Sequence, residues 1–401
     1  MTAINPQNFE STIDLAAATN TATLLQPMTP PIEQATYKAQ VADFVVNERL
    51  QLDFTNEGEH LWLHIEKSGI NTAYLAKLLS EWADIPLRDV GYSGLKDRQA
   101  LTTQWFSLRI PKKQLPATEF APVDIKEQET IRILAQHWHN KKLNRATHDA
   151  NQFVITLRDL VFTDDSGLAD NQALVEQHLA TISKTGVPNY FGPQRFGFNG
   201  NNITEALKLF AKESDNRLAN PAANTMANTT SAKKKPKRKG APREQNSMEL
   251  SAARSLIFNK ILAARVRNGS WDTGLNGEVF NLNGSGSIFA SEQIDDTLRE
   301  RLASGDIHPT AAMWGTSNDK ITAAAAELEN DVVQQDFLLA QLARGLEQRD
   351  IKAQRRALRL PVEDLSWQWL EGRTLVLSFT LTTGSFATSV LASLIKHLKL
   401  Q

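Results

Sequence analysis

Hydrophobic and polar residues alternate in stretches near both ends of the chain. Each of four stretches has a period of two, which predicts a strand with one buried face. Their apolar positions are Leu61, Leu63 and Ile65; Phe106, Leu108 and Ile110; Phe153, Ile155 and Leu157; and Leu375, Leu377, Phe379 and Leu381. We therefore expect a sheet-based domain to which both ends of the chain contribute.

Helical spacing dominates between these two ends. A helix is predicted to begin at an Asn71 or Thr72 cap and to end before Pro86. Its apolar stripe consists of Leu75, Leu78, Leu79 and Trp82. Residues 247–267 and 332–349 also carry helical spacing. The pattern predicts an α+β protein in which a second domain is inserted into the sheet-based one.

Two segments lack periodicity altogether. Residues 1–25 are rich in Thr, Ala, Asn and Gln, so we expect a disordered N-terminal extension. Residues from about 212 to 246 contain the basic run 233–239, and we expect them to form a mobile loop. The run could hold RNA phosphates weakly or could simply aid solubility. The loop falls inside the predicted insertion, which extends from about 188 to 352.

Composition agrees with a large protein that works outside the membrane. The 401 residues, 41% of them hydrophobic, suffice for two or three cores. No run approaches the roughly 18 apolar residues that span a bilayer, and we expect a cytoplasmic protein. The absence of cysteine excludes disulfides and thiolate chemistry. His137 and His139 are a weak metal signal without further ligands, so no metal site is predicted.

The net charge of −1 is not that of a basic nucleic-acid binder. Cations are nevertheless clustered, and each cluster could follow a phosphate backbone or form a solvated surface. One cluster is Lys141, Lys142 and Arg145, and another is Lys352, Arg355, Arg356 and Arg359. Tyr190, Phe191, Arg195 and Phe196 could also contact RNA, although the glycines beside them are equally typical of a turn between domains.

A charged turn before the second predicted strand carries the candidate chemistry. Asp97 stands between Lys96 and Arg98, and nearby cations lower the pKa of a carboxyl group and keep it ionised. Gly91 and Gly94 would let the chain turn or let a ligand approach. An ionised carboxylate at the end of a strand can serve as a nucleophile or a base. On composition alone, a solvated surface turn is the more common explanation of such a segment.

Several motifs, in the same order along the chain, resemble those of the TruD family of tRNA pseudouridine synthases. Residues 94–105 match its active-site motif Gly-x-Lys-Asp-x-x-Ala-x-Thr-x-Gln-Trp. The other matches are Asp43 to Val46, Gly58 to His60, Lys142-Leu143, Asn151-x-Phe153, Pro188 to Gly197, Ser251 to Ser255, Ile307 to Thr310 and Gly384 to Val390. The resemblance covers the chain from about residue 38 to its end.

The resemblance implies a pseudouridine-synthase-like catalytic domain with a mixed, mostly antiparallel sheet, formed by residues 26–187 and 353–401. An inserted α/β TRUD domain would occupy residues 188–352. The implied catalytic carboxylate is Asp97. Substrate binding is implied for Phe44 and Phe386, which would stack on a flipped uracil, for Asn151, which would hydrogen-bond it, and for Lys96.

The implied reaction is the isomerisation of uridine 13 in tRNA, which needs no cofactor because it has no net redox change and no phosphate donor. We expect tRNA as the partner, no membrane association and a monomer. A hydrolase that releases uracil would use the same carboxylate. A non-catalytic tRNA-binding chaperone is a further alternative, against which the intact Lys96-Asp97 pair argues.

Overall fold

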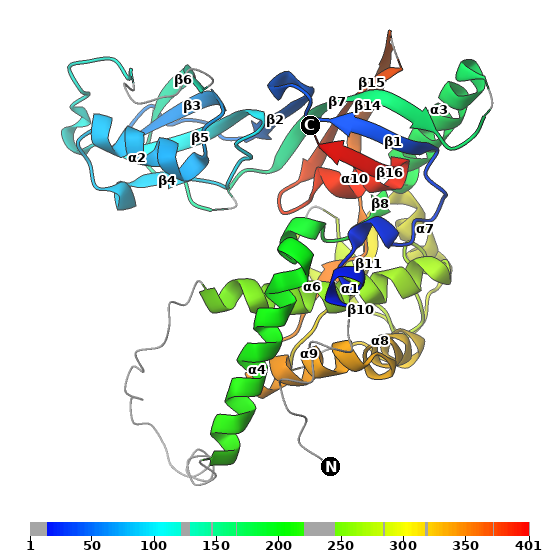
Figure 1. Cartoon of the computed structure of the whole chain (residues 1–401). Helices are drawn as coiled ribbons and strands as arrows, with labels where there is room; N and C mark the ends of the chain where they lie inside the picture. Colours follow the sequence, from blue (N-terminus) through cyan, green and yellow to red (C-terminus); the bar gives the residue numbers. More distant parts are fainter. Residues whose placement is uncertain are drawn as a thin grey trace. The chain divides into compact units, whose positions relative to one another are not determined.

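The chain divides into two compact units in the computed structural model (Figure 1). The sheet unit comprises Thr29–Gly186 and Pro361–Gln401, and the middle unit comprises Met1–Met28 and Val187–Leu360. The structure describes residues 14–121, 129–145, 147–165, 167–219, 245–283, 285–316, 320–371 and 373–400.

Ten strands of the described residues form the main sheet of the sheet unit. They are β1 (Ile32–Tyr37), β2 (Phe44–Arg49), β3 (His60–Ser68), β4 (Val90–Tyr92), β5 (Leu101–Arg109), β6 (Thr130–His139), β7 (Ala150–Phe162), β14 (Glu363–Leu370), β15 (Thr374–Thr382) and β16 (Ile395–Leu400). Their central order is β14-β15-β7-β2-β5-β3-β6, with β1 beside β7 and β16, and β4 beside β5. The β2–β5 and β1–β16 pairs are parallel and the others antiparallel, so the predicted mixed, mostly antiparallel sheet is confirmed.

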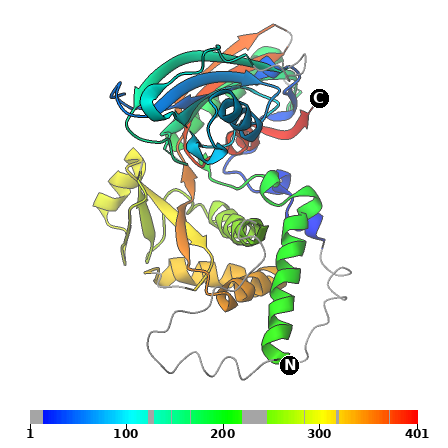
Figure 2. The same ribbon diagram turned by 90° about the vertical axis from the view of Figure 1, so that its left-hand side faces the viewer.

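Among the described residues, three α-helices accompany this sheet: α2 (Thr72–Trp82), α3 (Leu168–Thr185) and α10 (Ala387–Leu394). Asn71 caps α2, because its side chain accepts a hydrogen bond from the Tyr74 backbone. Helix α2 lies against the sheet (Figure 2). Its apolar stripe packs on alternate residues of β3 and β5. This core includes Leu75 and Leu79 from the helix and Leu61, Leu63, Ile65, Phe106 and Leu108 from the strands.

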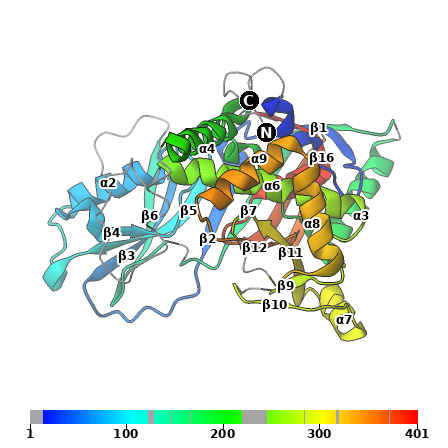
Figure 3. The ribbon, with the colours of Figure 1, turned by 90° about the horizontal axis from the view of Figure 1, so that it is seen from below.

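The middle unit combines helices with a small sheet (Figure 3). Its helices are α1 (Leu15–Ala18), α4 (Asn201–Ala219), α6 (Gln245–Arg267), α7 (Asp296–Ser304), α8 (Ala323–Gln335) and α9 (Phe337–Gln348). Its strands are β8 (Val187–Pro188), β9 (Val279–Leu282), β10 (Ile288–Ala290), β11 (Ile307–Met313), β12 (Gln354–Ala357) and β13 (Arg359–Leu360). The strand order β10-β9-β11-β12 forms one sheet, and β13 pairs with β8. Helix α6 contacts α4, α8, α9 and β11.

The insertion ends later than the sequence pattern indicated. Residues 353–360 were expected in the catalytic domain, but β12 pairs with β11 and β13 with β8, which hold this segment in the middle unit. The helical stretch predicted at 332–349 is also divided. Asp336 interrupts it and caps α9, accepting a hydrogen bond from the backbone of Leu339.

Both segments that lack periodicity are partly ordered. Residues 14–25 do not match the expected disordered extension: they include α1, which contacts Phe198–Gly200, and the Leu25 carbonyl accepts a bond from the Tyr190 hydroxyl. Residues 212–219 of the predicted loop belong to α4, and 245–246 belong to α6. Residues 1–13 and 220–244, with the basic run, lie outside the described residues. In the described parts of the chain, no helix is long and apolar enough to cross a membrane.

Candidate active site

The turn that carries Asp97 connects β4 to β5 in the sheet unit and is fastened from two sides. Thr72, at the start of α2, accepts a hydrogen bond from the Lys96 backbone (3.0 Å) and donates one to Gln104 (2.9 Å). Gln104, on β5, donates in turn to the Gly94 carbonyl (3.2 Å). A helix end and a strand therefore fix the backbone on which Asp97 lies.

The two glycines of this region differ in what they require. A Cβ atom on Gly91 would lie 2.3 Å from the Leu143 carbonyl oxygen, so a side chain does not fit there. A Cβ atom on Gly94 would meet only a His148 ring carbon at 3.6 Å, an ordinary contact. Close approach of two backbone segments explains Gly91, whereas the space around Gly94 does not demand a glycine.

The Asp97 carboxylate is accessible and ionised. Its side chain is 40% exposed. The Lys38 ammonium lies 2.5 Å from Oδ2, and the Gln99 backbone donates to Oδ1 at 3.0 Å. Burial raises the pKa of Asp97, but the Lys38 bond, the Gln99 bond and the charges of Lys38 and Lys67 outweigh it, and the pKa is lowered. The carboxylate is therefore negatively charged at neutral pH.

The cations that act on Asp97 are not its neighbours in the sequence. Lys38 comes from the end of β1 and Lys67 from β3, where Lys67 is buried and donates to the Asp97 carbonyl at 3.5 Å. Burial lowers the pKa of Lys67 to about 8. Arg98 instead donates to the Gly69 carbonyl, and Lys96 is turned toward other groups. The predicted ionised state of Asp97 thus has a different source from the one the sequence indicated.

Phe44 lies beside the same ammonium group. It is the first residue of β2, and the Lys38 Nζ atom is 4.4 Å from its ring centre, within cation–π distance. Val45 pairs with Leu101 across the parallel β2–β5 ladder, which brings this end of β2 to the Asp97 turn. Lys38 therefore links the carboxylate with a half-buried aromatic ring.

Lys96 and Asn151 belong to a buried polar network next to this turn. The Lys96 ammonium lies 2.8 Å from the Glu48 carboxylate, with the two side chains 6% and 0% exposed. It also donates to Asn151 Oδ1 at 2.8 Å, and Asn151 Nδ2 lies 3.1 Å from His148 Nε2. His148 Nδ1 is hydrogen-bonded to Ser93. Burial and the Lys96 charge lower the pKa of His148, so its ring is neutral at pH 7.

Phe386 follows β15 through a tight turn at Gly384 (φ 87°) and precedes α10. β15 pairs with β7 so that Leu381 lies opposite Asn151, and the Thr383 hydroxyl donates to the His148 carbonyl at 2.6 Å. The turn before Phe386 is thereby tied to the Asn151 network. The ring is half-buried, which leaves part of it exposed.

The predicted residues are thus carried by neighbouring elements of one sheet, and the structure adds four that the sequence prediction missed. These are Lys38, Lys67, Glu48 and His148. Glu48 lies two residues after Val46 in β2 and so on the same face of the strand, and a carboxylate behind an apolar residue on one strand face was a signal that could have been used. Lys38 lies 59 residues before its partner, and nothing in the local pattern marks it.

Comparison with known proteins identifies the family. A family model described as tRNA pseudouridine synthase D (TruD) matches residues 29–239 and 201–394, which is most of the chain. The chain belongs to the TruD family. The tRNA pseudouridine synthase D of Psychrobacter arcticus is 66% identical to it over 400 residues, 96% of each chain. That of Xanthomonas campestris pv. campestris is 41% identical over 359 residues, 89% of this chain and 90% of the relative.

A solved structure shows that the TruD fold is shared. The crystal structure of a putative tRNA pseudouridine synthase D from Methanosarcina mazei superposes with a TM-score of 0.64 at 19% identity, and the match covers 93% of this chain and 96% of that one. The resemblance stated from the motifs and the α+β fold are both confirmed.

The aromatic residues of the TruD motif at 188–197 have a structural role. Tyr190, Phe191 and Phe196 are buried, and Asn259 on α6 bonds to both backbone groups of Phe191 at 2.9 Å. These rings are therefore core residues of the middle unit. Arg195, in contrast, is only half-buried.

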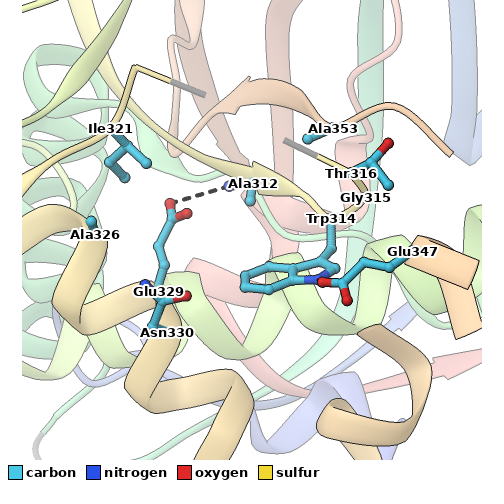
Figure 4. A pocket seen from close by; sticks show the side chains of 10 residues that line it. All are labelled: Ala312, Trp314, Gly315, Thr316, Ile321, Ala326, Glu329, Asn330, Glu347 and Ala353. Carbon is cyan, nitrogen blue, oxygen red and sulfur yellow. Dashed lines mark hydrogen bonds between the residues drawn. The ribbon is translucent and has the colours of Figure 1, made fainter. Parts of the chain in front are cut away.

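A pocket of about 500 Å³ also lies in the middle unit, beside the end of β11 (Figure 4). Its two carboxylates are already engaged. Glu347 accepts a bond from the Trp314 indole at 2.9 Å, and Glu329 accepts one from the Ala312 backbone at 3.2 Å. None of the predicted site residues lines this pocket.

The two histidines that gave a weak metal signal belong to an aromatic cluster. The His137 ring is stacked on Phe54 with centres 4.4 Å apart, and His139 meets Trp62 edge-on at 5.5 Å. Within the described ranges, no group of three or more candidate ligands could hold a metal ion.

Proposed function

We propose that this protein converts uridine to pseudouridine at position 13 of tRNA, with Asp97 as the catalytic carboxylate. The observation that carries the proposal is an accessible, ionised carboxylate, held by Lys38 and the Gln99 backbone, in a chain of the TruD family. The relatives described above are named tRNA pseudouridine synthase D, which supports tRNA as the substrate.

The reaction is an isomerisation in which atoms and electrons balance within the nucleoside. The bond from ribose C1′ to uracil N1 breaks, the base turns, and C1′ joins C5. The hydrogen on C5 is lost and N1 gains one. Asp97 would either attack C1′ as a nucleophile or remove a proton from the sugar, and both roles require the charged form. No step calls for an external donor or acceptor.

A uridine stacked in tRNA must first be flipped out to reach a carboxylate. We assign the flipped base to Phe44 and Phe386, since stacking on an aromatic ring contributes about 1 to 3 kcal/mol per base. Lys38 occupies one face of Phe44, so the base would use the other.

Asn151 retains hydrogen-bonding capacity for the flipped base. Its Oδ1 atom accepts from Lys96 and its Nδ2 atom contacts His148. An amide offers two donors and two acceptor lone pairs, so with the contacts of the described residues counted, one of each remains for the uracil. We accordingly treat Lys96 as a positioning residue that orients Asn151 rather than as a group that touches the base.

We propose a monomeric enzyme, because the residues assigned to the site all lie in one compact unit. Its tRNA substrate supports action in the cytoplasm. Size-exclusion chromatography with light scattering, in the presence and absence of tRNA, tests the first point.

The central experiment compares Asp97→Asn with wild type in single-turnover conversion of a tRNA that has uridine 13. We expect conversion to fall by far more than tenfold while filter binding of the same tRNA stays within a few-fold, because affinity comes mainly from phosphate and shape contacts. Asp165→Asn, at an exposed carboxylate of the sheet unit, is the matched control.

Residual conversion within about tenfold of wild type, a barrier change of only about 1.4 kcal/mol, would contradict the role of Asp97. Product analysis separates the alternatives. A hydrolase would leave an abasic ribose and free uracil, and a chaperone would bind tRNA without changing any nucleoside.

A further inference from the structure

Adjacent arginines on β12 have different partners. Arg355 forms an ion pair with Glu329 at 2.8 Å, so its charge is compensated. Arg356 points to the other side of the strand, as successive residues of a strand do, and donates to the neutral Asn189 side chain at 2.6 Å. Its Nε atom is buried and has no hydrogen-bond partner within the described part of the chain.

Arg195 lies next to Arg356 on the same aromatic ring. The two Cζ atoms are 5.1 and 4.3 Å from the centre of Phe191. Burial lowers the pKa of Arg356, and the charge of Arg195 lowers it further, to about 10. Two like charges are therefore held close together by the core of the middle unit. Arg195 Nη1 also donates to the Ser251 hydroxyl of α6 at 3.1 Å.

Arg254 brings a third guanidinium to this group. It stands three residues after Ser251 on α6, so the two side chains are neighbours on one helix face. Arg254 donates to the Met313 carbonyl at 2.8 Å and approaches Gln354 Oε1 at 3.4 Å. Gln354 lies two residues before Arg356, on the same face of β12. Helix α6 and the sheet that contains β12 are seen together in Figure 3.

Arg195, Arg254 and Arg356 form what we call the arginine cluster. The groups that Arg254 and Arg356 contact in the described structure are carbonyl and amide oxygens and, for Arg356, aromatic rings, with no carboxylate among them. Half-buried guanidinium groups without an anion are costly, and a phosphate group satisfies their planar donor pairs well. The rings of Phe191 and Phe258 beside the cluster are buried, so a ligand would contact the guanidinium groups and not the rings.

We propose that the arginine cluster binds a backbone phosphate of the RNA substrate. The identity of the ligand rests on the proposed function, whereas the cluster itself rests on its geometry. Its contribution is to affinity and position, and it takes no part in bond breaking at the uridine.

The test measures tRNA binding by Arg195→Gln, Arg254→Gln and the double variant across a series of salt concentrations. Each substitution should weaken binding about fivefold or more at low salt. Each should also reduce the slope of log affinity against log salt by about 1, as expected for a lost phosphate contact. Single-turnover conversion at saturating enzyme should stay within about twofold of wild type, since the cluster does not touch the reacting atoms.

Control variants separate charge from folding. Arg344→Gln removes an exposed arginine of α9 and should leave affinity and slope unchanged. Arg254→Lys keeps the charge and should keep the wild-type slope with weaker affinity, because lysine lacks the paired donors. Thermal unfolding of each variant identifies those whose fold has changed, and the remaining variants decide the question.

Wild-type affinity and slope in the folded double variant would overturn the proposal. If inorganic phosphate stabilises the wild type but not the double variant while tRNA binding is unaffected, the site takes a free anion and the RNA assignment is wrong. Neither result touches the proposed function, whose failure would appear as absence of pseudouridine with the wild-type protein.

Discussion

The buried ion pair between Lys96 and Glu48 gives a sharp prediction about a residue of the predicted site. The 2.8 Å contact is almost completely shielded from water. Lys96→Met would leave the Glu48 carboxylate buried without its counter-charge, which typically costs about 3 to 5 kcal/mol. The Asn151 side chain would also lose a donor. We therefore expect that this substitution, on the turn that carries Asp97, causes a large loss of unfolding free energy.

The assay is a double-mutant cycle of Lys96→Met, Glu48→Gln and the double variant in urea, followed by circular dichroism and tryptophan fluorescence. Removal of both charges should cost less than the sum of the single changes, with a coupling of about 2 kcal/mol or more. Lys77→Met is the matched control. Its partner Glu81 lies 3.5 Å away, both side chains are more than half exposed, and such pairs contribute about 0.5 kcal/mol or less.

The reasoning is refuted if Lys96→Met loses as little unfolding free energy as Lys77→Met and only its turnover is lower than that of wild type. Lys96 would then contact the substrate directly, as the family resemblance implied, and its pairing with Glu48 would not be structural.

Three further results are expected. Burial, assisted by the Arg359 charge, lowers the pKa of His308 to about 4, so its contribution to stability is complete above about pH 6.5 and is lost as pH falls toward 4. Wild type should lose about 2 kcal/mol more than His308→Gln between pH 7.5 and 5 in urea unfolding; equal losses would contradict this. Phe386→Ala should lower turnover strongly with little change in melting temperature, whereas a loss of about 3 to 5 kcal/mol of stability would identify a core residue. Gly91→Ala should destabilise the fold and Gly94→Ala should not, and similar melting temperatures for the two would disprove the packing argument.

Local periodicity predicted the helices and strands that have one hydrophobic face. The alternation at Leu61 to Ile65 and at Leu375 to Leu381 corresponds to β3 and β15, and the stripe after Asn71 corresponds to α2. Periodicity carries no information on which strands pair. The assignment of β12 to the middle unit therefore emerged only from its ladder with β11.

The candidate site shows the same division between local and non-local information. The motif around Asp97 led to a residue whose carboxylate is accessible and charged. The groups that set this charge, Lys38 and Lys67, come from β-strand ends and interiors distant in the sequence, and folding alone brings them there. Side chains on either side of a residue in a turn point in different directions, so Lys96 and Arg98 were poor guides. The roles of Phe44, Asn151 and Phe386 remain predictions.

The pairing of β1 with β16 has a consequence for synthesis of the chain. β1 ends at Tyr37 and its parallel neighbour β16 begins at Ile395, so the two strands leave the ribosome far apart in time. β7 likewise has to wait for β15, about 200 residues later, before one of its edges is covered. At about 5 to 20 residues per second, these edges stay open for ten seconds or more. The middle unit can complete its own contacts during that interval, so the main sheet, most of whose strands are made before residue 187, is completed only after the middle unit.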